Sequence, residues 1–110
     1  MDEAERFNTI VMMNNGKLLM KGSPAVLKSS MNKIIAEVVT ENLRETYNLI
    51  TRNNEYEAQL FGDRIDIALS TEPDLIPIEN LLKENNIILM SKRIKPVSLE
   101  NVFIHVLKED

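Results

Sequence analysis

The chain has 110 residues, of which 44% are hydrophobic and 27% are charged, which is the composition of an ordinary globular protein and not of a disordered one. That length suffices for one domain, or for a small domain with an appendage. The formal net charge of −4 argues against a nucleic-acid-binding protein held by a broad basic face, and the lack of cysteine excludes disulfides and thiolate chemistry.

The first stretch of the chain predicts a helix end followed by a β-hairpin. Residues 2–7 carry three acidic side chains, which suit the positive end of a helix dipole. The apolar runs IVMM and KLLM then flank the sequence Asn-Asn-Gly at 14–16, and Asn and Gly tolerate the positive φ angles of a tight turn. We therefore expect two antiparallel strands joined by that turn.

A short helix and a linker are predicted next. Gly22 ends the second strand, Ser23 is a good N-cap, and Pro24 suits the first helical position, where its missing N–H does no harm. Residues 29–32, with the sequence SSMN, are the best candidate for a linker because small polar residues there separate two differently organised halves.

Residues 33–94 predict the order β-α-β-β-α-β. The expected elements are a strand at 33–39, a helix capped by Asn42 with Glu45, strands at 56–61 and 64–70 around Gly62-Asp63, a helix opening at Pro77, and a strand at 87–94. Right-handed crossovers fold this order into a four-stranded antiparallel sheet with both helices on one face. The predicted fold class is α+β: a ferredoxin-like β-α-β-β-α-β sandwich with an N-terminal β-hairpin and a closing C-terminal helix.

The second face of that sheet is also predicted to be apolar. The runs KIIAEVV (33–39) and IILM (87–90) are apolar on both faces, whereas a sheet with helices on one side should have a polar other face. We expect the closing helix, the hairpin or a second chain to cover it. The closing helix follows its cap, Ser98, and its apolar residues share one side: Leu99, Val102, Phe103 and Val106.

The sequence contains no recognisable catalytic, cofactor-binding or metal-binding set. Its three glycines, Gly16, Gly22 and Gly62, lie in predicted turns and form no phosphate-binding loop. His105 is the single histidine, and a structural role is favoured because a catalytic histidine needs an oriented partner. No apolar run approaches the eighteen or so residues that span a bilayer.

The remaining polar and methionine patterns favour structural roles. Asp63 and Asp66 are three positions apart, so they should point to opposite faces and make a poor carboxylate pair. The basic run 92–95, with Lys108, is interpreted as a solvated edge strand protected by charge in preference to a phosphate or lipid-headgroup site. Core filling is favoured over a binding groove for the strand methionines Met12, Met13, Met20 and Met90, although Met12 and Met13 cannot both point inward.

The first 28 residues closely resemble the segment that follows the switch histidine in ATP-binding cassette (ABC) ATPases. In that family a helix containing EAE is followed by a strand, an Asn/Asp-Gly turn, a second strand, and G-S/T-P before a short helix. The matching residues here are Glu3, Ala4, Glu5, Asn15, Gly16, Lys17, Gly22, Ser23 and Pro24. Each feature alone is weak, but the ordered set is specific.

The end of the chain resembles one subgroup of that family, the ATPase subunits of bacterial exporters of drugs, antibiotics, ions or polysaccharides. In those proteins a small accessory domain follows the cassette and closes with S-L-E-[DN]-V-F. The matching residues are Ser98, Leu99, Glu100, Asn101, Val102 and Phe103. Residues 33–94 are similar to that accessory domain only in the order of their elements.

The resemblance implies a C-terminal region with the end of an ATPase domain at 1–28, a linker at 29–32 and an accessory domain at 33–110. The phosphate loop, signature and switch histidine would lie upstream, so ATP and magnesium would belong to the parent ATPase and hydrolysis to it alone. The accessory domain would serve regulation and dimerisation. Its expected partners are a second copy and, through the parent, a membrane permease at the cytoplasmic face, without nucleic acid or direct membrane insertion.

Two alternatives stay open. A β-α-β-β-α-β domain at the end of a transporter ATPase also resembles amino-acid-binding regulatory domains, so a small-molecule sensor is the second hypothesis. Glycines in the first strand–helix loop would favour it, and the segment VVTENLRE has none. A free-standing protein that starts at Met1 is the third hypothesis, and the abrupt acidic helix at 2–7 makes an internal methionine or a cut the favoured interpretation.

Overall fold

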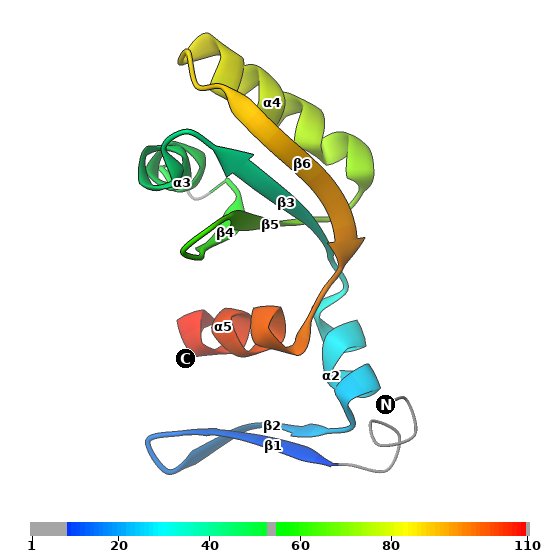
Figure 1. The fold of residues 1–110 in the computed structure, drawn as a ribbon. Helices are drawn as coiled ribbons and strands as arrows, with labels where there is room; N and C mark the ends of the chain where they lie inside the picture. Colours follow the sequence, from blue (N-terminus) through cyan, green and yellow to red (C-terminus); the bar gives the residue numbers. More distant parts are fainter. Residues whose placement is uncertain (1–8, 53–54, 110) are drawn as a thin grey trace. The chain divides into compact units, whose positions relative to one another are not determined.

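The computed structural model describes residues 9–52 and 55–109, so the helix predicted at 2–7 lies outside the described residues. The described residues form two compact units (Figure 1). The middle unit comprises residues 33–96, and the flanking unit comprises residues 9–32 together with residues 97–109. The flanking unit is thus assembled from two segments that the whole middle unit separates in the sequence.

The middle unit is built on a four-stranded antiparallel sheet. Its elements in chain order are β3 (Ile34–Thr40), α3 (Leu43–Thr51), β4 (Glu57–Leu60), β5 (Ile65–Leu69), the 3₁₀ helix η1 (Glu72–Asp74), α4 (Leu75–Glu84) and β6 (Leu89–Pro96). The strand order is β4-β5-β3-β6, so β4 and β6 form the edges. This order confirms the predicted α+β, ferredoxin-like fold.

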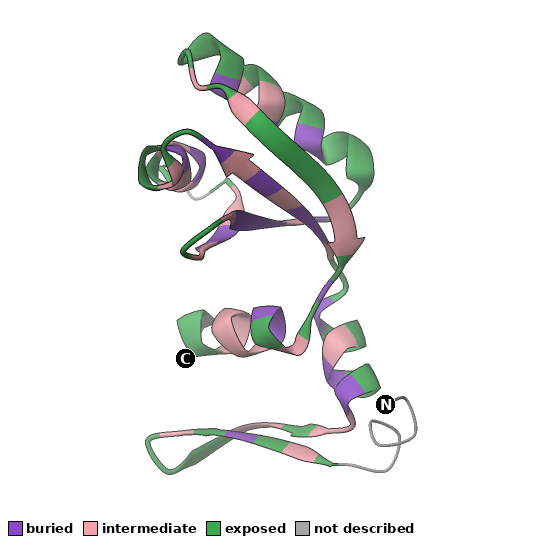
Figure 2. Cartoon of the chain, viewed as in Figure 1, coloured by how far each residue is buried: buried purple, intermediate pink, exposed green. Residues whose placement is uncertain are grey.

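The core of the middle unit lies on one face of this sheet. Strand side chains alternate between faces, and the inward set on β3 includes Ala36 and Val38. Both helices contribute to the same core, α3 through Ile50 and α4 through Ile78. Figure 2 colours the chain by burial. The main cluster of buried core residues is Ala36, Val38, Ile50, Ala58, Ile65, Ile67, Leu69, Leu75 and Ile78.

The start of α4 differs from the prediction by two residues. The helix begins at Leu75, so Pro77 lies within its first turn, where a backbone N–H would have no partner inside the helix. The preceding η1 turn is held by its own cap, in which the Thr71 backbone N–H donates to Asp74 Oδ2 at 3.0 Å. Pro77 therefore indicated the first turn of α4 and not its first residue, Leu75.

The start of β6 is also two residues later than predicted. Asn86 adopts a left-handed φ of 58°, and the next residue, Ile87, donates its N–H to Leu82 O at 2.9 Å. This bond satisfies a carbonyl at the end of α4, which otherwise has no helical partner. Ile87 therefore belongs to the helix cap, and the strand begins at Leu89.

The flanking unit contains a hairpin and two helices. Its elements are β1 (Ile10–Asn14), β2 (Lys17–Gly22), α2 (Pro24–Met31) and α5 (Leu99–Glu109). The hairpin prediction is confirmed, with φ angles of 55° at Asn15 and 78° at Gly16 in its turn. The two helices α2 and α5 contact each other.

Helix α2 continues through most of the segment predicted as a linker. Ser29 and Ser30 donate their hydroxyls to the carbonyls of Val26 and Leu27 one turn earlier, so these small polar side chains fit the helix surface. Met31 is buried, and only Asn32 leaves the helix, as a left-handed cap with φ 50°. The linker composition marked a helix end and not an extended connection.

The hairpin has one buried and one exposed face. Met12 is 8% exposed, whereas Met13 is 59% exposed, as expected for neighbours on a strand. Val11 and Leu18 are also more than half exposed, and Leu18 is the cross-strand partner of Met13. The predicted core-filling role is confirmed for Met12 and is wrong for Met13, and also for Met90 on β6, which is 62% exposed.

Candidate functional site

All family-motif residues that the structure describes lie in the flanking unit. Gly16 is in the hairpin turn, and Gly22, Ser23 and Pro24 join β2 to α2. The second motif, residues 98–103, forms the cap and first turns of α5. Glu3, Ala4 and Glu5 lie outside the described residues. Two motifs separated by the whole middle unit in the sequence are therefore brought into one compact unit.

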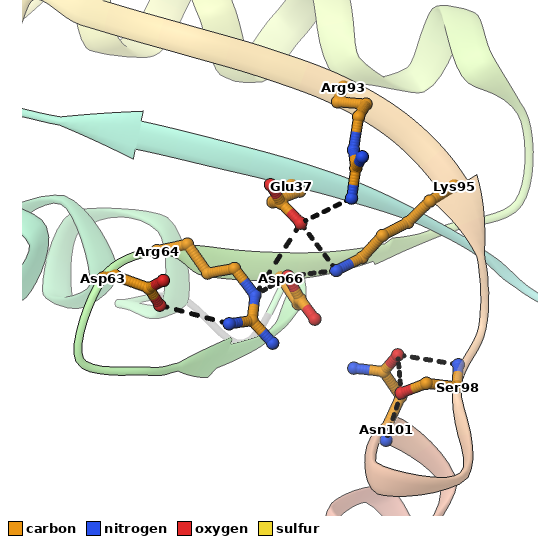
Figure 3. Close-up of polar contacts among 8 residues, drawn as sticks. All are labelled: Glu37, Asp63, Arg64, Asp66, Arg93, Lys95, Ser98 and Asn101. Atoms are coloured by element: carbon orange, nitrogen blue, oxygen red, sulfur yellow. Dashed lines mark hydrogen bonds and ion pairs between the residues drawn. The ribbon is translucent and has the colours of Figure 1, made fainter.

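The S-L-E-N-V-F motif is the cap of α5 (Figure 3). Ser98 Oγ accepts a hydrogen bond from the Asn101 backbone N–H at 3.1 Å. In return, Asn101 Oδ1 accepts from the Ser98 backbone N–H at 2.9 Å and from the Ser98 hydroxyl at 2.8 Å. This reciprocal arrangement satisfies N–H groups that have no partner within a helix.

Burial explains the other constraints in this motif. Asn101 is fully buried and Val102 is 1% exposed, while Leu99 and Phe103 are half-buried. A buried amide must keep its hydrogen bonds, because an unpaired polar group in the interior is unfavourable. The motif therefore defines where α5 begins and which side of it is buried, which is a structural role and not a catalytic one.

The middle unit holds a cluster of charged side chains that the sequence analysis missed. It lies on the sheet face opposite the core and is called here the charge cluster: Glu37, Arg64, Asp66, Arg93 and Lys95 (Figure 3). Three neighbouring strands supply it, because Glu37 on β3 is the cross-strand partner of Asp66 on β5 and of Arg93 on β6. The prediction that this face is apolar is wrong at its centre.

Glu37 and Asp66 are the two anionic centres of the charge cluster. Lys95 Nζ lies 2.7 Å from Glu37 Oε1 and 3.3 Å from Asp66 Oδ1. Arg64 Nε lies 3.2 Å from Asp66 Oδ1 and 3.8 Å from Glu37 Oε1, and Arg93 Nη2 lies 3.2 Å from Glu37 Oε1. The Asp66 side chain is 1% exposed, so Arg64 and Lys95 contact a buried carboxylate.

These contacts shift two pKa values. The hydrogen bond from Lys95 lowers the pKa of Glu37, and this effect together with the nearby charges of Lys95 and Arg93 outweighs burial, which would raise it. Burial alone would lower the pKa of Arg64, but the charges and hydrogen bonds of Asp66 and Asp63 outweigh it and raise the pKa. Both shifts favour the charged forms of Glu37 and Arg64.

The charge cluster bears on two predictions. Asp63 and Asp66, expected to make a poor carboxylate pair, each contact the intervening Arg64, whose Nη1 lies 3.1 Å from Asp63 Oδ1. The basic residues of β6 lie on an edge strand, as predicted. Arg93 and Lys95 are not simply solvated, however, because both form ion pairs with Glu37. One local signal could have revealed this: a single acidic residue inside each of two apolar strands, Glu37 in β3 and Asp66 in β5, together with the basic run of β6.

A groove between α4 and β6 is a further feature of the middle unit, and it could hold a ligand. It has a volume of about 660 Å³, and its apolar part includes Ile76 and Ile94. Lys92 Nζ on β6 and Glu79 Oε1 on α4 lie 2.8 Å apart at its wall. The remaining lining residues are Glu72, Pro73, Leu75 and Arg93.

The single histidine, for which a structural role was predicted, lies in the flanking unit. His105 is half-buried on α5. Among residues 9–52 and 55–109, no three His, Asp or Glu side chains are grouped so that they could hold a metal ion. None of the helices in this part of the chain is long and apolar enough to cross a membrane.

Comparison with known proteins does not identify a relative. No protein-family model matches the chain, and no curated protein matches it.

Proposed function

We propose that this chain is the C-terminal region of an ABC transporter ATPase subunit and couples hydrolysis in an upstream domain to transport. The observation that carries the proposal is the assembly of the flanking unit. Its two segments, residues 9–32 and 97–109, are the described segments that resemble this family, and they fold together through α2 and α5. The middle unit, which resembles the family only in the order of its elements, is inserted between them.

We assign ATP and magnesium to the parent protein, because the resemblance puts the phosphate loop, the signature and the switch histidine upstream. Among the glycines of residues 9–52 and 55–109, Gly22 lies nearest to a following helix, just before Ser23, the N-cap of α2. At that helix start, however, Ser23 Oγ already accepts from the Val26 N–H, and Pro24 has no N–H to offer a phosphate. In this proposal the middle unit is a regulatory module and not a catalyst, and the dimer contact is assigned to the flanking unit.

The proposed partners are a second copy of the chain and, through the parent, a membrane permease at the cytoplasmic face of the cell membrane. The exposed apolar hairpin residues Val11, Met13 and Leu18 support an association surface in the flanking unit. Light scattering at increasing protein concentration should detect dimers, and a chain that stays monomeric at high concentration would overturn this part of the proposal.

Two measurements test the assignment itself. The genomic sequence in frame upstream of Met1 should encode a phosphate loop, an LSGGQ-type signature and a switch histidine. Isothermal titration of the chain with Mg-ATP should show no binding. An in-frame stop codon just upstream, or micromolar ATP binding by the chain, would contradict the proposal.

A small-molecule sensor is the second candidate, and the groove between α4 and β6 favours it. A volume of about 660 Å³ lies within the range of small-molecule sites. A thermal-shift screen of amino acids and exported compounds would detect such a ligand by the rise in melting temperature. Replacing Ile76 by Lys should abolish the shift if the ligand binds in the groove.

A further inference from the structure

We infer that the middle unit acts as a clamp: its folding brings the C-terminal helix α5 onto α2, and its opening releases α5. This property goes beyond the proposed function and does not depend on it. It follows from how the chain passes between the two units and from the difference between their cores.

The two helices that meet in the flanking unit are far apart in the sequence. Helix α2 ends at Met31 and α5 begins at Leu99, with the whole middle unit between them. Helix α5 has 11 residues, and an isolated helix of about that length is marginal in water. A two-stranded hairpin alone is also marginal. The flanking unit therefore depends on bringing its two segments together.

The middle unit performs this closure through its own strand pairing. β3 and β6 are neighbours in the sheet, and Ile34 is the cross-strand partner of Pro96. These residues are the first of β3 and the last of β6. When the pair forms, the two exits of the chain from the middle unit come side by side, and only residues 32–33 and 97–98 separate them from α2 and α5.

The size of the effect follows from loop closure. With the middle unit unfolded, the contact between α2 and α5 must close a flexible loop of roughly 64 residues. With it folded, the flexible part shrinks to roughly four residues, which raises the closing probability by about 60-fold. The gain arises from geometry alone and needs no contact between the two units.

The coupling acts in both directions, because a coupling free energy is reciprocal. The buried hydrophobic cluster of the middle unit nevertheless comes from its own elements, with residues between Ala36 and Ile78. The flanking unit has no continuous core of this kind, because its second segment begins only at residue 97. A ligand that stabilises the middle unit would thus favour docked α5, and any event that opens the middle unit would free it.

Hydrogen exchange on the full chain, read by mass spectrometry over a urea series, tests the clamp. Ile78→Ala removes a fully buried side chain from α4 and should raise exchange in the middle core by about 30-fold or more. The amides of α5 should lose protection together with it. Ile76→Ala is the matched control, because Ile76 lies on the same helix and is 57% exposed.

The reciprocal variant is Val102→Ala on α5, with the exposed Leu107→Ala as its control. Val102→Ala should raise exchange in α5 by about tenfold and, because the coupling is reciprocal, should raise exchange in β3 and β5 by no more than that. Should Ile78→Ala fail to fold, Ile78→Val gives a smaller core opening for the same comparison. The clamp is wrong if α5 keeps its protection while the middle core opens.

Discussion

The two units differ in how the chain builds them. The middle unit is one continuous stretch, residues 33–96, and its core is closed by its own sheet and helices. The flanking unit is made of two segments, and its hairpin leaves Val11, Met13 and Leu18 exposed. A continuous unit can fold from its own sequence, whereas a divided unit depends on whatever brings its segments together.

The family-like motifs lie in the divided unit, and this distribution explains what they do. The hairpin turn and the Ser98–Asn101 cap define where elements start and stop, and neither places a reactive group. In the middle unit the polar residues instead form the charge cluster on the sheet. Substitutions in one unit, with the stability of both units measured, test this difference. The substitution with the largest expected effect comes first.

The charge cluster should give the middle unit a pH-dependent stability. Glu37→Gln removes the charge that binds Lys95 and Arg93 and should lower the free energy of unfolding at pH 7 by about 1 to 2 kcal/mol. Because the folded pKa of Glu37 is lowered, its contribution is complete above the unfolded pKa of about 4.3 and is lost as the pH falls through the lower folded value. Urea denaturation between pH 7 and pH 2.5 measures the difference.

The control for this prediction is Glu79→Gln. Its partner Lys92 is 53% exposed, so the ion pair should contribute less than about 1 kcal/mol at pH 7. A difference between wild type and Glu37→Gln that stays constant down to pH 2.5 would contradict the role of the Glu37 charge.

The fold could be predicted further than the charge cluster because the two depend on different information. Turns, caps and apolar periodicity are local, so Asn15–Gly16, Asn42 and Ser98 were placed correctly from neighbouring residues. The cluster depends on the register that sets Glu37 opposite Asp66 and Arg93, and that register joins residues far apart in the chain. The boundaries at Pro77 and Ile87 shifted because a cap or a first turn extends beyond the residue that signals it.

The two helix caps allow a matched comparison between the units. Ser98 Oγ accepts from the Asn101 N–H in the flanking unit, and Asn42 Oδ1 accepts from the Glu45 N–H at 3.0 Å in the middle unit. Replacing either by Ala should cost about 1 kcal/mol. Hydrogen exchange should show Ser98→Ala loosening α5 most, whereas Asn42→Ala should loosen α3 and also increase release of α5. Unchanged protection of α5 in Asn42→Ala would contradict the coupling between the two units.

The smallest expected effects come from alanine substitutions in the two hairpin turns, at Gly16 and at Gly62. Comparing them separates the cost of backbone strain from the cost of crowding. A Cβ added at Gly16 or at Gly62 would meet no atom within 4 Å, so neither position is crowded. Gly16 has φ 78°, where an alanine is disfavoured, and Gly16→Ala should lower stability of the flanking unit by about 1 kcal/mol. Gly62 does not adopt positive φ, so Gly62→Ala should be neutral or stabilise the middle unit by up to about 0.5 kcal/mol, through a less flexible unfolded chain. Hydrogen exchange measured in each unit at increasing temperature distinguishes the two variants. A larger loss of stability from Gly62→Ala than from Gly16→Ala would mean that the φ angle of the glycine does not determine the cost of the substitution.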